Sequence, residues 1–178
     1  MNITKIKINT NTTAKSELER HPVPILGIDY KVKIEYKNIR IAELNVTNKI
    51  IKISLPNKYK KTSNKQILDL AIEKMYEQIA IIEIERAMEK TRIELGFAPE
   101  DYSIEKLKNK LGICSEGKIV INPDIVMFHR NLIDYIVLHQ YCHLKYKTHA
   151  KSFIKLIEKY EPKYKKYEAE IKELGYTN

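Results

Sequence analysis

The segment His139-Gln140-Tyr141-Cys142-His143, with His149 six residues further on, constrains this chain more than any other feature. Two histidines four residues apart lie one turn apart on the same face of a helix. Their spacing matches the pattern H-E-x-x-H, in which both imidazoles bind one zinc ion and the intervening Glu accepts a proton from water. Gln140 stands at the position of that Glu. The pattern therefore predicts a metal site that keeps its ligands but lacks its general base.

His149 is the expected third ligand of this site. Residues 146–148 are expected to end the helix and turn the chain back, with Thr148 capping a new helix whose first residue is His149. Three imidazoles leave one exchangeable position in a tetrahedral zinc shell, which is the arrangement of catalytic rather than structural sites. The sequence therefore predicts that His139, His143 and His149 bind Zn²⁺.

The residues around these ligands have less specific interpretations. The metal helix is expected to begin near Asn131, with Asp134 favouring its first turn. Cys142 is expected to be a packed or weakly exposed thiol, although a role as a fourth ligand stays open. His21 and His129 lack partners at metal spacing, so no role is predicted for them.

Length and composition indicate one soluble domain. The 178 residues, 43% of them hydrophobic, suffice for one sizeable core but are cramped for two, so a single domain over residues 1–178 is expected. No apolar run approaches the ~20 residues that cross a bilayer, and the amino terminus does not form a signal-peptide core. Two cysteines are too few for a disulfide framework. We therefore expect a cytoplasmic monomer without membrane contact.

The hydrophobic pattern divides the chain into a strand-rich part, residues 1–56, and a helix-rich part, residues 63–178. In the first part, apolar residues alternate with polar ones, as over residues 28–36, which we interpret as an antiparallel sheet. A long helix is expected from Ser63 to about Leu95, although an interruption is usual at this length. The sequence therefore predicts an α+β fold in which a sheet and a long helix precede the helical metal-site region.

A further strand is expected at residues 118–122, after a polar connection that begins near Pro99. It lies just upstream of the metal helix, where a free strand edge could bind an extended polypeptide. Its candidate substrate-binding residues are Ile119, Val120, Ile121 and Asn122. A purely structural strand is equally compatible with the pattern.

Lysines spread over the whole chain give a formal net charge of +9, which permits nucleic acid as a partner but identifies no reading surface. Residues 160–167 interleave Tyr with Lys, a pattern that could follow a phosphate backbone. A solvated helix face, with lysine stems lying over apolar surface, is the plainer interpretation.

The metal helix and its surroundings resemble the YgjP-type metallopeptidase-like domain, whose pattern is I-D-Y-V-x-x-H-E-L-x-H-L-x-x-x-x-H-x-x-x-F-W. The matching residues are 131–144, His149 and Phe153, with weaker matches at residues 25–30, 53–56, 114–115 and 121–122. The departures are Leu-Gly-Ile-Cys at residues 111–114 in place of Trp-Gly-Ser-Cys, Ile154 in place of the second aromatic residue, and Gln140.

This resemblance implies a zincin-like arrangement around the metal helix and a zinc-dependent hydrolase of the metallopeptidase type. Related SprT-like and WLM-type domains are zinc proteases, some of which act on proteins attached to DNA. A bacterial YgjP-type protein has been assigned a nucleoside-triphosphate pyrophosphatase role. Peptide hydrolysis, nucleotide hydrolysis and a non-catalytic zinc-containing module that binds peptide or nucleic acid therefore all stay open.

Gln140 itself has two interpretations. Glutamine keeps the shape of glutamate but has no carboxylate, so it cannot accept the proton. A deliberate exchange that stops hydrolysis while keeping the metal and the ligand is the favoured interpretation, and natural loss of catalysis is the alternative. Either origin predicts that this chain is catalytically inactive and that a parent with Glu at this position is active.

Overall fold

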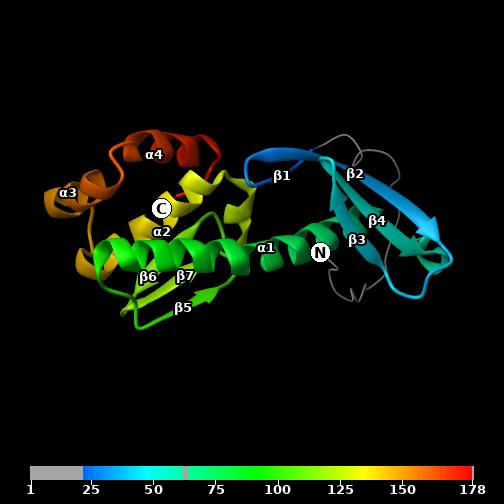
Figure 1. Ribbon diagram of the computed structural model, residues 1–178, viewed down its shortest axis with the longest axis horizontal. Coiled ribbons are helices and arrows are strands. Elements are labelled where there is room, and N and C mark those ends of the chain that lie inside the picture. The colour runs from blue at the N-terminus through cyan, green and yellow to red at the C-terminus, as the bar shows by residue number, and fades with distance from the viewer. Residues whose placement is uncertain (1–21, 62–63, 178) are drawn as a thin grey trace. The chain divides into compact units, whose positions relative to one another are not determined.

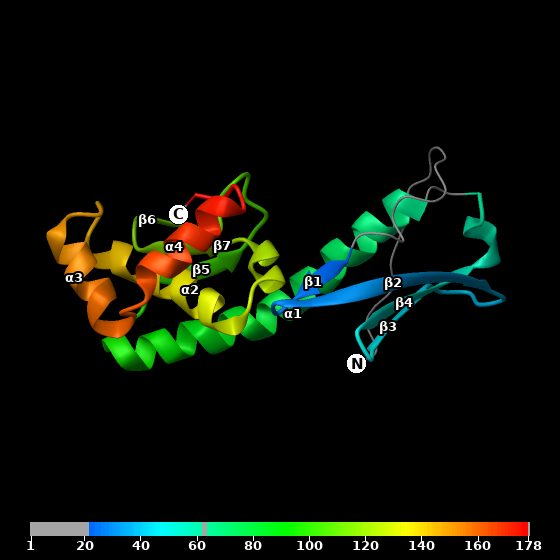
Figure 2. The ribbon, with the colours of Figure 1, turned by 90° about the horizontal axis from the view of Figure 1, so that it is seen from above.

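Figures 1 and 2 show the computed structural model of the chain, which describes residues 22–61 and 64–177. These residues form two compact units, one ending at Tyr76 and the other beginning at Glu77, and each is considered by itself below. Helix α1 (Asn64–Leu95) contributes residues to both units. That residues 1–178 form a single domain stays a prediction. Among the described residues, no helix is both long and apolar enough to span a membrane.

The first unit contains a mixed sheet of four strands in the order β1-β2-β4-β3. Its strands are β1 (Val23–Ile25), β2 (Ile28–Lys37), β3 (Glu43–Thr47) and β4 (Ile50–Pro56). Two tight turns, at residues 26–27 and 48–49, have positive φ at both central positions, as type I′ hairpins require. A short 3-10 helix, η2 (Asn57–Tyr59), follows β4.

The expectation of a purely antiparallel sheet is wrong for the central pair, because β2 and β4 run parallel. The pairs β1–β2 and β3–β4 are antiparallel. Alternation of buried and exposed side chains is the same in both kinds of ladder, so the sequence pattern does not determine strand direction. The direction follows from the connection at residues 38–42, which places β3 on the far side of β4.

One face of this sheet is buried, and no element of the described residues covers the other. Val32, Leu44 and Ile51 are buried, together with Ile67 and Met75 from the first turns of α1. The Tyr76 hydroxyl also donates a hydrogen bond to the Pro24 carbonyl, at 2.6 Å. These contacts form the core of the first unit.

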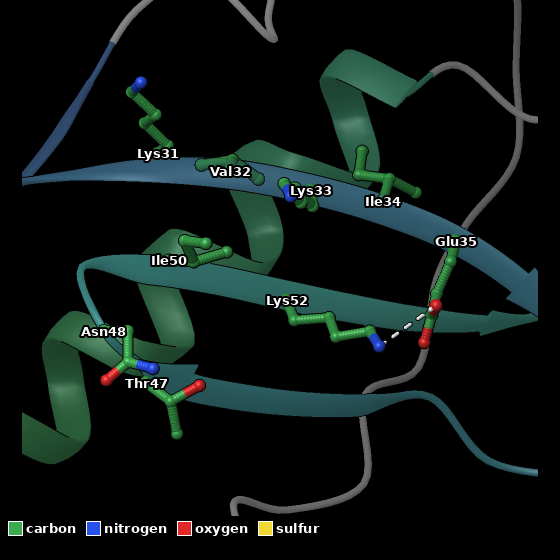
Figure 3. Close-up of a pocket in the computed structure, with 9 residues that line it drawn as sticks. All are labelled: Lys31, Val32, Lys33, Ile34, Glu35, Thr47, Asn48, Ile50 and Lys52. Atoms are coloured by element: carbon green, nitrogen blue, oxygen red, sulfur yellow. Dashed lines mark ion pairs between the residues drawn. The ribbon is translucent and has the colours of Figure 1, made fainter.

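The open face carries lysines from adjacent strands. Figure 3 shows Lys31, Lys33 and Lys52 on this face, around a hollow of about 600 Å³. Lys33 and Lys52 lie opposite one another in the parallel register, a placement that like charges disfavour. Lys52 forms an ion pair with Glu35 at 3.2 Å, whereas Lys31 and Lys33 have no acidic partner within the described ranges. The face is therefore positively charged.

Helix α1 continues without the interruption that its length suggested. It ends at Gly96, which has a positive φ and donates its N–H to the Arg92 carbonyl. In the second unit its buried residues include Ala80, Ile84 and Ala87, while Ile82 is 50% exposed. Alanine side chains are small, so neighbouring segments can approach the helix closely at these positions. The hydrophobic pattern alone does not indicate that alanines, and not Ile82, mark the buried face.

The second unit holds a sheet of three strands in the order β5-β7-β6, with α2 packed against β6 and β7. The strands are β5 (Asp101–Ile104), β6 (Gly112–Ser115) and β7 (Lys118–Ile121). The helices that follow are η3 (Pro123–Met127), α2 (Arg130–Lys145), α3 (Lys151–Tyr160) and α4 (Tyr164–Glu173). The α+β class predicted from the sequence is confirmed.

An ion-pair network holds α2 against α1 within the second unit. Glu83 is 4% exposed and accepts hydrogen bonds from the Arg130 guanidinium at 2.7 to 3.1 Å and from Arg86 at 3.1 Å. Arg86 and Lys90 in turn donate to Asp134, at 2.5 and 2.7 Å. The network therefore fixes the first turns of the helix that carries the histidines.

Candidate metal centre

Three histidines converge at the end of α2. The Nε2 atoms of His139 and His143 are 3.1 Å apart, and His149 Nε2 lies 3.0 Å from the first and 3.1 Å from the second. Imidazoles bound tetrahedrally to zinc at about 2.0–2.1 Å hold their nitrogens about 3.3 Å apart, so this spacing fits one ion. No other group of three or more metal-binding side chains occurs in the described part of the chain.

The three ligand positions differ in exposure, from buried His139 through half-buried His143 to exposed His149. His139 is 1% exposed on the core side of α2. Phe153 of α3 is fully buried beneath the group, with its ring centroid 4.6 to 5.0 Å from the three imidazole centroids. The site therefore has an apolar floor and opens to solvent at His149.

The environment keeps the buried imidazoles neutral. Burial, together with the neighbouring His143 and His149, lowers the pKa of His139 to about 3. The pKa of His143 is also lowered, mainly by burial. Neutral imidazole is the form that binds metal ions, so these two side chains are ready to bind at neutral pH.

The tautomer of His143 is fixed by the backbone. Its Nδ1 lies 3.0 Å from the Tyr146 carbonyl oxygen, which can only accept a hydrogen bond. Nδ1 therefore carries the proton, and the lone pair of the neutral ring is on Nε2, the atom that faces the other two histidines.

Gln140 is buried beside this group against β6. It is 1% exposed, and a β-carbon built on Gly112 would lie 2.8 Å from Gln140 Cγ. Its Nε2 atom is buried and has no hydrogen-bond partner within the described structure. A buried amide donor without an acceptor costs about 1–3 kcal/mol.

The sequence matches the YgjP-like metallopeptidase domain family over residues 2–174. This chain belongs to that family. Among solved structures it is similar to the metallopeptidase zymogen of Pyrococcus abyssi abylysin, with 28% identity and a TM-score of 0.46, over 49% of this chain and 90% of that one. It is also similar to the zymogen of Methanocaldococcus jannaschii jannalysin, with 23% identity and a TM-score of 0.46, over 51% of this chain and 88% of that one. No curated protein matches the chain.

Membership of the YgjP-like family indicates a metallopeptidase-type hydrolase with a divalent metal. The histidines that the structure brings together are the three that the spacing singled out, His139, His143 and His149. His149, however, does not begin a helix. It lies in the connection before α3, which starts at Lys151 after an N-cap at Ala150. The bend at residues 146–150 thus presents the third imidazole from a segment without regular secondary structure.

The metal helix starts close to Asn131, as expected, but the contacts of its first residues were not expected. Helix α2 begins at Arg130, and His129 is its N-cap, with a side chain that accepts a hydrogen bond from the Leu132 N–H. His129 therefore has a structural role, for which no prediction was made. N-capping depends on backbone geometry and not on the spacing between histidines. Asp134 lies beyond the first turn of α2, which contains no acidic residue, and pairs with Arg86 and Lys90 of α1. His21 lies outside the described residues.

The expectation that residues 119–122 offer a free edge is wrong. Strand β7 is the centre of its sheet, paired with β5 on one side and β6 on the other. Ile119 and Ile121 are fully buried, Val120 is half-buried, and the Asn122 amide donates to the carbonyls of residues 107 and 110. The sequence pattern does not indicate β5, because Asp101 lies in a polar stretch that follows Pro99.

The other polar groups near the site are structural. Cys142 is fully buried, and burial raises the pKa of its thiol to about 12, which keeps it protonated. Tyr141 is 1% exposed and its hydroxyl donates to the Met88 carbonyl at 3.1 Å. The expectation that Cys142 is a packed thiol is confirmed.

Proposed function

We propose that this YgjP-like chain binds one zinc ion through His139, His143 and His149 and binds a polypeptide there, but hydrolyses it slowly. The convergence of three Nε2 atoms within 3.1 Å of one another carries this proposal. An all-imidazole donor set suits zinc among the available divalent ions. When bound, zinc supplies Lewis acidity, which lowers the pKa of water and polarises a carbonyl group.

Gln140 supports the slow turnover. An amide can orient a water molecule or a carbonyl by hydrogen bonding, but it cannot accept a proton at neutral pH. Its side chain is held between α2 and Gly112, so another orientation would require the strand to move. A carboxylate in the same place could take the proton and return it to the leaving amine. This consequence is the same for a natural glutamine and for a deliberate exchange.

Strand β6, rather than β7, is the proposed docking edge for the polypeptide. It pairs only with β7 in the described structure and packs on Gln140 at Gly112. The Asn122 N–H donates to the Leu111 carbonyl at 2.9 Å. Because bonded positions alternate along an antiparallel pair, the backbone N–H and C=O groups of Gly112 and Cys114 face the free edge. An extended peptide could pair there, close to the histidines.

The direct test restores the missing carboxylate. The Gln140→Glu chain, loaded with zinc, is assayed with a library of peptides and with nucleoside triphosphates, beside the unmodified chain and a Gln140→Glu, His143→Ala control. Zinc-dependent peptide cleavage by Gln140→Glu alone supports the proposal, and triphosphate hydrolysis without peptide cleavage would replace the peptidase by a pyrophosphatase. Zinc binding without peptide cleavage or triphosphate hydrolysis would overturn the proposal that the chain is a hydrolase.

A second candidate is a non-catalytic module that binds nucleic acid. The observation that favours it is the open face of the first unit, where Lys31 and Lys33 lack acidic partners among the described residues and Lys33 faces Lys52. Clustered lysines of this kind release counterions when they contact phosphates. Salt-dependent binding that survives removal of zinc would support this candidate over the hydrolase.

A further inference from the structure

Tyr135 connects a metal-site histidine to a carboxylate on another helix. Its hydroxyl lies 3.3 Å from His139 Nδ1 and 3.3 Å from Glu168 Oε1. Tyr135 precedes His139 by one turn of α2, whereas Glu168 belongs to α4, which lies alongside α2 in Figure 2. The tyrosine side chain is 1% exposed, so bulk water cannot readily replace either partner.

The direction of the hydrogen bonds follows from the number of protons. A phenol has one proton, and an ionised carboxylate can only accept, so Tyr135 donates to Glu168. The phenol oxygen is then left to accept a proton from His139 Nδ1. A neutral imidazole protonated at Nδ1 has its lone pair on Nε2, which is the atom that faces His143 and His149.

The surroundings keep this order of donors and acceptors. In the described structure, His139 Nδ1 and Glu168 Oε1 are the only hydrogen-bond partners of the Tyr135 hydroxyl. His143 reaches the same tautomer by a different route, through the Tyr146 carbonyl. Two of the three histidines therefore have their Nε2 lone pairs selected by specific partners.

Contacts on either side of Glu168 hold α4 in place. The Tyr167 ring packs on the Tyr135 ring with centroids 5.4 Å apart, and on the His129 ring at 6.0 Å. Glu170 lies 3.4 Å from His129 Nε2 at the start of α2. Glu168 is thus placed by its neighbours on the same helix and not by a single contact.

We propose that Glu168 is a positioning residue which, acting through Tyr135, fixes His139 in the tautomer that binds metal and thereby strengthens zinc binding. The inference rests on the proposed zinc site, and it assigns the carboxyl-terminal helix α4 a part in that site. A carboxylate that acts on a ligating histidine through a hydrogen bond typically strengthens metal binding by 10- to 100-fold, so a loss of about that size is expected without it.

The variants are designed to separate charge from tautomer. In Glu168→Ala the phenol proton is free to turn toward His139 Nδ1, which favours the tautomer that cannot bind zinc. Glu168→Gln keeps an acceptor for the phenol and removes the charge, so its effect should be smaller. Tyr135→Phe breaks the connection, and Glu168→Ala should add little in that background. Glu173→Gln, on an exposed position of α4, is the matched control.

Two readouts on the full-length chain test the proposal. Imidazole ¹H–¹⁵N correlation spectra of the metal-free protein should show His139 protonated at Nδ1 in the unmodified chain and in Glu173→Gln, and at Nε2 in Glu168→Ala. Competition with a chelator should show zinc affinity about 10- to 100-fold weaker in Glu168→Ala, less reduced in Glu168→Gln and unchanged in the control. Thermal melts identify variants that are still folded.

The two proposals fail differently. Failure of the unmodified chain to bind zinc overturns the proposed function, while the metal-free spectra still decide the tautomer. An unchanged His139 tautomer and unchanged zinc affinity in folded Glu168→Ala overturn the positioning role. If Glu168→Ala does not fold, the other variants decide the question. Equal zinc affinity in Glu168→Gln, Tyr135→Phe and the control would then overturn the positioning role.

Discussion

Gly112 on β6 lies so close to Gln140 on α2 that a β-carbon at position 112 would approach Gln140 Cγ to 2.8 Å. This contact joins the free edge strand to the position of the general base. Any side chain at position 112 must displace either the strand or the residue at position 140, so the two positions are coupled.

We expect Gly112→Ala to destabilise the chain by about 1–3 kcal/mol, as overpacking of a well-packed site does. In the Gln140→Glu background it should also reduce kcat by displacing the carboxylate. Chemical denaturation and peptide hydrolysis measure the two effects, with Cys114→Ala on the same strand as the control. Full stability and full activity of Gly112→Ala would show that this contact does not constrain position 140.

The free edge of β6 can be tested with proline, which removes one backbone N–H. Because the N–H of residue 114 faces outward, Cys114→Pro should leave the sheet intact while weakening peptide binding about 5- to 10-fold, the worth of one net hydrogen bond of about 1 kcal/mol. The comparison is Ile113→Pro, whose N–H belongs to the β7 ladder and whose substitution should destabilise the fold. Equal peptide affinity in Cys114→Pro and Cys114→Ala would contradict docking along β6.

The convergence of the three histidines was predictable because it depends on local spacing. A spacing of four residues on a helix, and a third histidine after a short bend, already place three imidazoles close together. The strand order of the second sheet was not predictable. Strand β5 pairs with β7, and the alternation of polar and apolar residues does not indicate which strands pair. Glu168 was also not predictable, since its distance from Tyr135 depends on how α4 packs on α2.

Glu83 should contribute a pH-dependent part of the stability. The Arg130 hydrogen bond is the main cause that lowers the pKa of its carboxyl below the ordinary 4.5. A lowered pKa in the folded state means stability that is present above the unfolded pKa and lost as pH falls through the folded one. Glu83→Gln should therefore cost about 2 kcal/mol at pH 7, which is less than the roughly 3–5 kcal/mol of a fully buried pair because the Arg130 side chain is 61% exposed.

Denaturation of the unmodified chain and Glu83→Gln at several pH values checks this prediction. The difference between their free energies of unfolding should shrink as the pH falls below about 4.5. Glu89→Gln, which removes an exposed carboxylate of α1 that pairs only with Arg92 in the described structure, is the control and should change little. A difference that does not vary with pH would contradict the ion-pair account.

The open lysine face of the first unit should carry whatever affinity the chain has for nucleic acid. Replacing Lys31, Lys33 and Lys52 by Gln should reduce the slope of log K against log salt for duplex DNA by about 2–3, because each phosphate contact contributes about 0.9. The charge-matched control replaces three exposed lysines of the second unit, Lys147, Lys155 and Lys172. Equal slopes for the two triple variants would exclude this face as the binding surface.

The zinc content of the full-length chain tests the central claim most directly. After loading with zinc and removal of free metal by gel filtration, elemental analysis should find one zinc ion per chain. His139→Ala and His149→Ala should each lose it, whereas Lys155→Ala, at an exposed position of α3, should retain it. A metal-free unmodified chain, or zinc that persists in the ligand variants, would contradict the account.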